Sequence, residues 1–329
     1  MKKILITGIS GFVGGYCVNY LNSLDTPLEI HGISRSKPAW DFIRISSGRD
    51  RWHHFHTADL NNFPRIRTIM EKIQPDQIIH LAAQSSVGES WKSPVDSFVN
   101  NTSIFLNIID TVRCMDTGTR ILSVGSSEQY GVVSKNDLPL TEDHPLRPAN
   151  PYAVARVAQE HMAGVYHDGF GIDICCTRSF NHCGPGQTDR FVAGAITKQF
   201  ARIELGLQEP VIEIGDGTII RDFLDVRDVV SAYTLLLDKG KAGQAYNICS
   251  GRGYAISELV TMLSDRLTIE VQIKQNPTKM RPQENPAIFG SCEKIRSGLG
   301  WMPCHPLVDS LQEMVEYWKA RMDFSHRQG

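Results

Sequence analysis

Short apolar runs alternate along the first half of the chain with longer segments in which apolar residues recur at helical spacing. The run KILIT at residues 3–7 is typical of a strand buried on both faces, and Gly8 ends it. A segment of helical period then extends from about Gly11 to Leu24. The same alternation continues through expected strands at 28–34, 53–58, 77–82, 120–125 and 172–179 and expected helices near 64–73, 97–114 and 151–168. This pattern predicts an α/β fold with a doubly wound parallel sheet.

The alternation becomes irregular after about residue 180, where Gly, Pro and Asp interrupt the apolar runs. Short strands are expected near 211–214, 244–248 and 269–274, and helices near 191–206, 256–266 and 306–321. No internal repeat and no low-complexity linker separates the two halves. We therefore expect one domain over residues 1–180, to which 222–250 return, and a smaller interleaved α/β substrate-binding lobe made mainly of 181–329.

The composition restricts the class of partner. The chain has 329 residues, 41% of them hydrophobic, with 34 Lys and Arg against 36 Asp and Glu and a formal net charge of −2. This balance argues against a nucleic-acid or membrane-surface binder, and no apolar run approaches the ~18 residues of a membrane span. The apolar start stops after Ile6, which argues against a signal peptide, so we expect a cytoplasmic protein.

Neither the cysteines nor the histidines form a recognisable metal motif. The eight cysteines include no C-x-x-C pair, which favours buried reduced thiols over disulfides or zinc. His53, His54 and His56 are close in sequence, but only His54 and His56 would share a face of a strand, and no acidic third ligand is evident nearby. The sequence therefore favours a structural role for these histidines and predicts no metal site.

A glycine-rich turn connects the first expected strand to the first expected helix. It carries Gly8, Gly11 and Gly14, with Phe12 and Val13 at the start of the helix. Glycines permit a tight turn and let a diphosphate approach the backbone amides at a helix N-terminus. The G-x-x-G-x-x-G spacing also fits a plain strand-to-helix turn. Its position in the first βα unit favours a Rossmann-like domain that binds a nicotinamide dinucleotide.

The ends of the next strands supply the other expected contacts to the cofactor. Ser34 and Arg35 stand where an acidic residue would hold a ribose 2′-hydroxyl, and a hydroxyl followed by a guanidinium suits a 2′-phosphate instead. We therefore expect NADPH, with NADH as the alternative; the other interpretation of Arg35 is a solvated loop residue. Further residues expected along the cofactor are Asp59, Leu60, Leu81, Ala82 and Ala83.

Three polar segments are placed to meet at the carboxyl ends of the strands, where open α/β sheets bind ligands. They are HLAAQ at 80–84, SSEQYG at 126–131 and YAVAR at 152–156. On a helix Tyr152 and Arg156 share one face, where the cation would stabilise a phenolate that gives and takes a proton. Ser126 would hydrogen-bond the same reacting oxygen. Tyr152 alone would be an ordinary core or rim residue.

Together with the glycine-rich turn, these segments resemble the extended short-chain dehydrogenase/reductase family over essentially the whole chain. The resemblance implies an NAD(P)-dependent oxidoreductase acting on a nucleotide sugar, with Tyr152 and Ser126 as catalytic residues. Arg156 stands at the position of the family's lysine, which bonds the nicotinamide ribose. Arginine keeps the positive charge but is planar, longer and not geometrically equivalent. This departure leaves open a catalytically weak or silent protein that binds a nucleotide sugar or NADPH.

Later motifs resemble those of GDP-6-deoxy-4-keto-mannose reductases, which are related to GDP-mannose 4,6-dehydratases. These motifs are RSFNHCGPGQ at 178–187, RDFLDVRDV at 221–229 and YNICSG at 246–251, while RPQE at 281–284 resembles a motif shared by the wider group. The resemblance implies a substrate held by Gln84, Ser127, Glu128, Asn181, Val192, Lys198, Arg202, Arg221, Arg281 and Glu284. For Lys198 and Arg202 a solvated helix face is an equal alternative. Asp225 and Asp228 fit caps of a helix starting near Val226.

The two related activities place different demands on Glu128. A dehydratase needs an extra acid/base carboxylate, and its Thr-Ser-Glu pattern corresponds here to SSE at 126–128. The glycine-rich turn and the segments FNHCGP and RDF instead follow the reductase pattern. We therefore expect reduction of the C4 ketone of GDP-4-keto-6-deoxy-D-mannose to a GDP-6-deoxyhexose of the GDP-D-rhamnose type, with the dehydratase as the alternative. The resemblance also implies a homodimer through the helices near 97–114 and 151–168.

Overall fold

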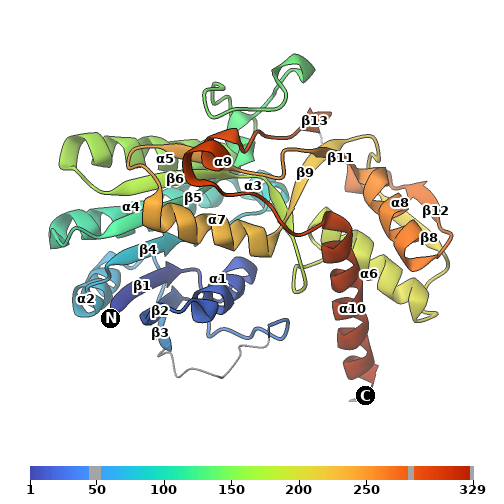
Figure 1. Cartoon of the computed structure of the whole chain (residues 1–329), viewed down its shortest axis with the longest axis horizontal. Coiled ribbons are helices and arrows are strands. Elements are labelled where there is room, and N and C mark those ends of the chain that lie inside the picture. Colours follow the sequence, from blue (N-terminus) through green and yellow to red (C-terminus); the bar gives the residue numbers. More distant parts are fainter. Residues whose placement is uncertain (44–52, 281–284, 327–329) are drawn as a thin grey trace.

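Seven parallel strands form a central sheet in the order β10-β6-β5-β4-β1-β2-β3 (Figure 1). The computed structural model describes residues 1–43, 53–280 and 285–326, with side chains described as far as residue 323. The strands are β1 (Lys2–Thr7), β2 (Leu28–Ser34), β3 (His53–Thr57), β4 (Gln77–His80), β5 (Arg120–Ser126), β6 (Ile174–Ser179) and β10 (Ala245–Ile248). The chain winds outward from β1 in both directions, which confirms the predicted doubly wound α/β fold.

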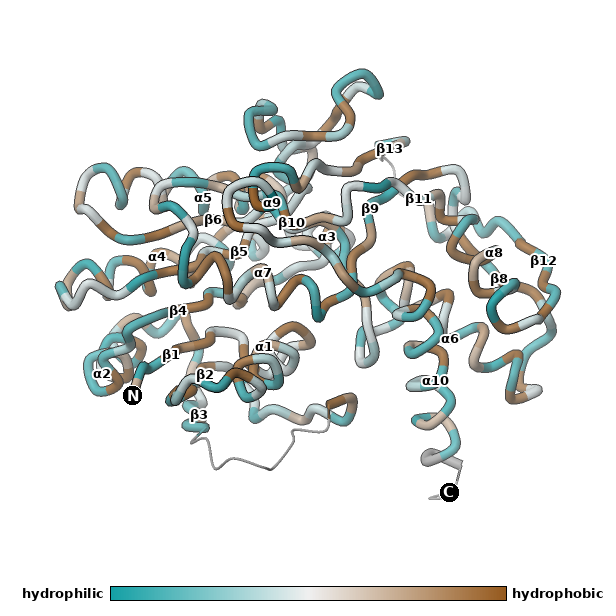
Figure 2. The backbone as a smooth tube through the Cα atoms, in the orientation of Figure 1, coloured by the Kyte–Doolittle hydropathy of each residue, from teal (hydrophilic) through white to brown (hydrophobic). Residues whose placement is uncertain are grey.

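Helices cover both faces of this sheet because its central strands are apolar on both sides. One face packs against α1 (Phe12–Ser23) and α7 (Val226–Lys239). The other packs against α2 (Phe63–Ile73), α4 (Pro94–Met115) and α5 (Pro151–Phe170), with α3 (Val87–Lys92) before α4. In β1, Ile4 and Ile6 join the first core while Leu5 joins the second. Figure 2 shows the hydrophobic residues along β1 and β4 in brown.

A smaller lobe lies on the right of Figure 1 and is built around three helices. These are α6 (Val192–Glu204), α8 (Ile256–Leu267) and α10 (Leu307–His326), which bury Phe200, Leu259 and Leu311 in a separate core. Its strands are β7 (Asn181–Cys183), β8 (Val211–Ile214), β9 (Ile220–Asp225), β11 (Gly253–Ala255), β12 (Gln272–Gln275) and β13 (Ala287–Ile288). Strand β9 pairs with β7, β11 and β13, and β8 pairs with β12.

Four short elements complete the described chain. They are the 3-10 turns at Ser127–Tyr130, Lys135–Asp137 and Pro277–Lys279 and the helix α9 (Glu293–Leu299). Among the described residues, no helix combines the length and the apolar character that crossing a lipid bilayer requires.

The expected strands and helices are all present, and some of them differ in their bounds. The expected strand 77–82 ends at His80, and the expected strand 269–274 is observed at Gln272–Gln275. Helix α7 begins at Val226 with Asp225 as its N-cap, as expected for Asp225. Asp228 has another role: its carboxylate accepts hydrogen bonds from the backbone N–H groups of Cys304 and His305. It therefore ties the segment before α10 to α7.

Candidate active site

The glycine-rich turn joins β1 to α1 in a conformation that requires glycine at two positions. Gly8 has φ of +70°, and an added Cβ there would lie 2.9 Å from Cα of Ala82. A Cβ on Gly14 would lie 2.2 Å from the carbonyl oxygen of Ile9. The first turn of α1, all of whose residues are described, contains no acidic side chain. Its amides are therefore available to an anion such as a diphosphate.

The other residues expected along the cofactor lie at the carboxyl edge of the sheet. Ser34 is buried at the end of β2 and its hydroxyl donates to the carbonyl of Ser36, while Arg35 is exposed. Asp59 is exposed and accepts hydrogen bonds from the backbone and side-chain amides of Asn61, while Leu60 is buried. The half-buried residues Leu81, Ala82 and Ala83 follow β4, next to the glycine-rich turn.

Tyr152 and Arg156 form a buried phenol–guanidinium pair on α5, as the helical spacing predicts. Nε of Arg156 donates to the Tyr152 hydroxyl at 3.1 Å, and Nη1 donates to the Val124 carbonyl at 3.0 Å and to Oε1 of Gln159 at 2.6 Å. Gln159 in turn donates to the hydroxyl of Ser123 at 2.7 Å. These contacts fix the guanidinium against β5.

The same contacts fix the position of Tyr152 along the sheet relative to the end of β5. Gln159 and Arg156 both bind the Ser123–Val124 segment of β5. Tyr152 precedes these two residues on α5, and Ser126 follows that segment at the end of β5. Ser126 is half-buried as the last residue of β5, and its backbone N–H donates to Oε1 of Gln129. The two predicted catalytic hydroxyls therefore belong to the same edge of the sheet.

Glu128 is hydrogen-bonded to the start of α5. Its Oε2 accepts a hydrogen bond of 2.8 Å from Nδ2 of Asn150, and Oδ1 of Asn150 accepts from the backbone N–H of Ala153 at 2.8 Å. Asn150 is thus both the N-cap of α5 and a partner of the carboxylate. Ser127 beside it is buried, and the backbone of Gln84 is held by the buried side chain of Asn101.

A buried histidine lies beneath this edge of the sheet. Burial, with a smaller effect from the charge of Arg156, lowers the pKa of His80 to about 3, so the ring is neutral at physiological pH. Its Nδ1 lies 3.0 Å from the hydroxyl oxygen of Thr7, which also accepts from the backbone N–H of Ala82 at 3.3 Å. His80 therefore holds the loop after β4 against β1, next to the glycine-rich turn.

An ion-pair network supports the back of the site. Arg178 on β6 donates to Oε1 of Glu160 at 2.6 Å and to the hydroxyl of Tyr130 at 3.2 Å. Oε2 of Glu160 also accepts from Nε2 of Gln129, and the Tyr130 hydroxyl donates to Oδ1 of Asn247 at 2.6 Å. These contacts join α5, the turn after β5, and strands β6 and β10. The segment that carries Ser126 and Glu128 is consequently held from several sides.

Asp222 is the centre of a hydrogen-bond network in the smaller lobe. This buried carboxylate accepts from the backbone N–H and hydroxyl of Ser250, both at 2.8 Å, and from the backbone N–H groups of Gly251 and Gly290. Burial raises its pKa to about 6 although these hydrogen bonds oppose the shift. Asp222 thus ties β9 to the segments after β10 and β13.

Two of the residues expected to hold the nucleoside diphosphate flank Asp222. Nδ2 of Asn181 donates to the Asp222 carbonyl at 3.1 Å, and its side chain is exposed. Arg221 is half-buried and donates to the carbonyls of Ile220 and Asn285, both at 2.8 Å. The predicted partners Arg281 and Glu284 lie outside the described residues. Asn285, the next described residue, anchors this segment to the Gly131 carbonyl.

The residues expected on the helix at 191–206 are distributed along α6. Val192 is exposed at its first turn. Nζ of Lys198 forms an ion pair with Asp189 at 2.6 Å. Arg202, in the last turn, donates to Oε1 of Gln208 and the Leu207 carbonyl. Arg202 is therefore engaged at the C-terminal end of α6, opposite the end that carries Val192.

Several residues that build the site were not assigned a role from sequence: Asn150, Gln159, Glu160 and Asp222. Asn150 carries a recognisable signal, since an Asn followed by Pro at the start of an apolar-periodic helix is typical of an N-cap. Gln159 and Glu160 look like ordinary helix residues. Their partners lie on β5 and β6, so only the tertiary structure identifies them.

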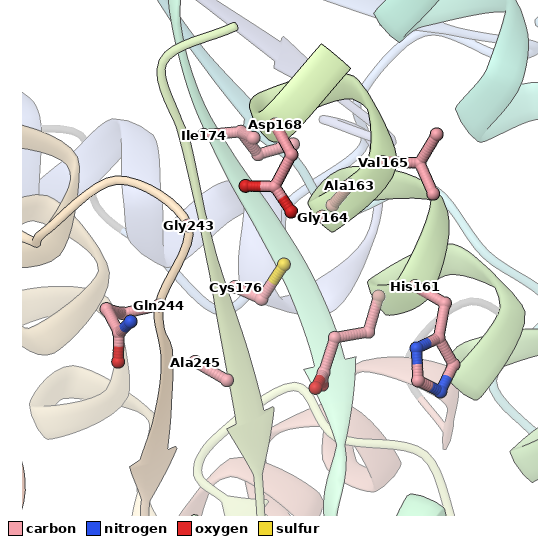
Figure 3. Close-up of a pocket in the computed structure, with 11 residues that line it drawn as sticks. His161, Ala163, Gly164, Val165, Asp168, Ile174, Cys176, Gly243, Gln244 and Ala245 are labelled. Carbon is pink, nitrogen blue, oxygen red and sulfur yellow. The ribbon is translucent and has the colours of Figure 1, made fainter. Parts of the chain in front are cut away.

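A hollow of about 340 Å³ lies further along the same helix, away from Tyr152 and Arg156, and Glu160 of the ion-pair network is among its lining residues (Figure 3). It is lined by α5, the first half of β6 and the segment leading into β10, with Asp168, Cys176 and Gln244 among the lining residues. Tyr152 and Arg156, the residues expected to be catalytic, lie at the opposite end of α5. The hollow is therefore distinct from the candidate active site.

The chain resembles two kinds of characterised enzyme along nearly its whole length. Residues 5–314 match the family described as GDP-mannose 4,6 dehydratase. The chain is 34% identical over 321 residues to a GDP-6-deoxy-D-mannose reductase of Pseudomonas aeruginosa, covering 98% of each protein. It is 28% identical over 352 residues to a GDP-mannose 4,6-dehydratase of Yersinia enterocolitica, covering 96% of this chain and 93% of that protein.

A solved structure gives the same relationship in three dimensions. The structure of RMD from Pseudomonas aeruginosa complexed with NADPH matches with a TM-score of 0.83 and 32% identity, over 98% of this chain and 100% of that chain. The fold, including the smaller lobe, is thus shared along the length of both chains.

Proposed function

Because the chain belongs to the GDP-mannose 4,6-dehydratase family, we propose that it is an NADPH-dependent reductase of GDP-4-keto-6-deoxy-D-mannose. The product is a GDP-6-deoxyhexose of the GDP-D-rhamnose type. The observation that carries this proposal is the buried Tyr152–Arg156 pair, with a donor–acceptor distance of 3.1 Å, at the sheet edge that also carries the glycine-rich turn. The 34% identity to a GDP-6-deoxy-D-mannose reductase supports the substrate.

The glycine-rich turn and its surroundings fit a nicotinamide dinucleotide. Gly8 and Gly14 keep the backbone close to Ala82 and Ile9, where a Cβ would intrude, and the amides at the start of α1 suit the diphosphate. In the proposed site Ser34 and Arg35 hold the 2′-phosphate, which favours NADPH over NADH. The cofactor supplies the hydride that reduces C4.

The side chains of this chain provide the proton and the charge stabilisation. The Tyr152 hydroxyl donates its proton to the developing alkoxide, and the Ser126 hydroxyl donates a hydrogen bond to the same oxygen. The Arg156 guanidinium, fixed by Val124 and Gln159, places a permanent positive charge beside the phenol as the proton leaves.

The nucleotide sugar is proposed to lie between the two lobes. Asn181 and Arg221 face its nucleoside diphosphate, with Arg281, Glu284 and Lys198 as further proposed contacts. A guanidinium can form two parallel hydrogen bonds to phosphate oxygens, which suits Arg221. Gln84, Ser127 and Glu128 are proposed to contact the sugar.

In a reductase Glu128 binds a sugar hydroxyl and does not transfer a proton. Its Oε2 is held by Asn150 at 2.8 Å, an arrangement that positions the carboxylate as a hydrogen-bond acceptor. Glu128→Gln keeps the shape and one acceptor oxygen. We expect this variant to retain reduction of the supplied 4-keto sugar with a higher KM. A loss of turnover with unchanged substrate binding would instead assign Glu128 acid/base chemistry.

NADPH oxidation in the presence of GDP-4-keto-6-deoxy-D-mannose tests the proposal against a silent binding protein. The natural protein is compared with Arg156→Lys and with Tyr152→Phe. We expect turnover by the natural protein and loss of at least about 100-fold in Tyr152→Phe, the range of general acid catalysis. Tight NADPH binding without turnover by the natural protein would establish the binding-protein alternative.

We further propose that α4 and α5 pair with those of a second copy of the chain. These helices lie side by side in Figure 1 and expose the apolar side chains Val95, Phe98, Val99, Val154, Val165 and Phe170. Val165 also lines the hollow of Figure 3, which opens on this helix. Val165→Glu is expected to shift the protein to monomer in analytical ultracentrifugation, whereas Val132→Glu, an exposed site on neither helix, is expected to leave it dimeric.

A further inference from the structure

Histidines and a glutamate lie together on one face of the central sheet, at the edge formed by β2 and β3. Glu29 and His31 are alternate residues of β2, and His54 and His56 are alternate residues of β3, so each pair shares a face. The parallel register places His31 directly beside His54. The acidic group that the sequence motif around His54 lacks is therefore supplied by the neighbouring strand.

The distances among three of these side chains suit one metal ion. Nε2 of His31 lies 2.8 Å from Oε1 of Glu29, and Nε2 of His54 lies 3.6 Å from the same oxygen. The three ligand atoms all lie within 4.8 Å of one another. A tetrahedral ion bound at about 2.0–2.1 Å separates its ligand atoms by about 3.3 Å, so the two measured distances lie on either side of that value.

The other nitrogen of His31 also has a partner. Its Nδ1 lies 3.3 Å from Nε2 of His56, which matches the outer hydrogen bond that usually orients a metal-bound imidazole. The His31 side chain is 7% exposed and that of Glu29 20%, whereas His54 is 46% exposed. Two ligands are thus fixed within the sheet, and the third faces the solvent from which an ion would enter.

Glu29 supplies the negative charge of this cluster. Among the three proposed ligands, its carboxylate is the group that compensates for the charge of a divalent ion.

We propose that Glu29, His31 and His54 bind a Zn²⁺-type transition metal ion, with His56 orienting His31. Two imidazoles and a carboxylate are a donor set that zinc accepts, and water completes the tetrahedron. When the ion binds Nε2 of His31, that ring carries its proton on Nδ1 and donates a hydrogen bond to Nε2 of His56. The ion then links β2 to the edge strand β3. This site is remote from Tyr152 and independent of the proposed reductase activity.

The test measures metal binding to the untagged full-length protein by equilibrium dialysis with Zn²⁺ and by the visible spectrum with Co²⁺. We expect one equivalent of Co²⁺ to give the absorption bands of a tetrahedral complex. His54→Gln and Glu29→Gln are each expected to weaken binding at least about tenfold. His53→Gln is the matched control: it lies on the same strand, and its ring points to the other face, towards Asn22 at 3.1 Å.

A second cluster in the described chain, Asp228 with Cys304 and His305, provides the competing outcome. Binding that survives Glu29→Gln and His54→Gln but is lost in Cys304→Ser would overturn the proposal, as would the absence of any Co²⁺ bands. Thermal melting without metal confirms that the variants fold, and added Zn²⁺ is expected to raise the melting temperature of the natural protein and of His53→Gln only.

Discussion

Arg156 stands where the sequence resemblance implies a lysine. A lysine at this position would present one compact ammonium, whereas the guanidinium here spans from the Tyr152 hydroxyl to Val124 and Gln159. Gln159 supplies an acceptor for Nη1 and is itself fixed by the Ser123 hydroxyl. The arginine is therefore accommodated by a matching set of neighbours and does not simply replace a lysine.

Gln159→Met is expected to lower kcat about tenfold, because a hydrogen bond to a charged group contributes about 1.5–3 kcal/mol and its loss lets the guanidinium move. The KM for the keto sugar should change little, since Gln159 is buried behind Arg156. Gln159→Glu, which keeps an acceptor, should retain more activity. In an Arg156→Lys background Gln159→Met should cost much less, and equal losses in both backgrounds would show that the two residues act separately.

Asp222 gives a pH dependence whose sign is defined by its raised pKa. The carboxyl titrates near 3.8 when unfolded and at about 6 when folded, so between these values the folded state binds more protons. Its contribution to stability is therefore present at low pH and is lost as the pH rises through about 6. In Asp222→Asn this contribution is absent. The difference in unfolding free energy between the natural protein and this variant should shrink by about 1–2 kcal/mol from pH 5 to pH 7, and a difference that grows with pH would contradict this assignment.

At the scale of single elements, one residue at the start of α5 both stabilises the helix and holds a residue of the proposed sugar site. Asn150 caps the helix with one side-chain atom and holds Glu128 with another. Asn150→Ala should lower the unfolding free energy by about 1 kcal/mol and raise the KM for the nucleotide sugar. Asn150→Ser keeps a cap but not the contact to Glu128, so it should restore stability while KM stays high. If Asn150→Ser restored both the unfolding free energy and the KM, the contact between Asn150 and Glu128 would not be needed for substrate binding.

The glycine-rich turn makes a second prediction about an element. Gly14→Ala places a methyl group against the backbone of Ile9, so α1 must shift, with an expected loss of about 1–3 kcal/mol in stability and weaker NADPH binding. Gly298 is a helical glycine in α9 where an added Cβ would meet no described atom within 4 Å. Gly298→Ala should leave NADPH affinity unchanged. Isothermal titration with NADPH measures both, and unaltered affinity in Gly14→Ala would remove the turn from the cofactor site.

How far the sequence predicts these elements depends on what stabilises each of them. Strand β1 is an apolar run that lies between two helical layers, so its pattern alone identifies it. Strands β7, β11 and β13 have only two or three residues each. They form because each pairs with β9, which comes from another part of the chain. No local pattern of that length is distinctive. The same reasoning applies to Glu29, which meets His54 only because β2 and β3 pair in one register.

At the scale of the whole molecule, the two lobes contribute different residues to the proposed site. The central sheet supplies Ser126, Tyr152 and the glycine-rich turn, while the smaller lobe supplies Asn181, Asp222 and Arg221. The relationship to nucleotide-sugar oxidoreductases expected from sequence motifs is confirmed by the family match and by the relatives along the full chain. With a net charge of −2, the molecule provides no general attraction for a nucleoside diphosphate, which is why we propose that local arginines hold it.

The central claim about the whole molecule is that it acts as a reductase and not as a dehydratase. Product analysis by NMR tests this claim most directly. GDP-mannose and GDP-4-keto-6-deoxy-D-mannose are supplied separately, each with NADPH and the natural protein. We predict that the keto sugar is converted to a GDP-6-deoxyhexose with consumption of NADPH and that GDP-mannose is recovered unchanged. Conversion of GDP-mannose to the 4-keto-6-deoxy sugar, with the supplied keto sugar left unreduced, would contradict the account.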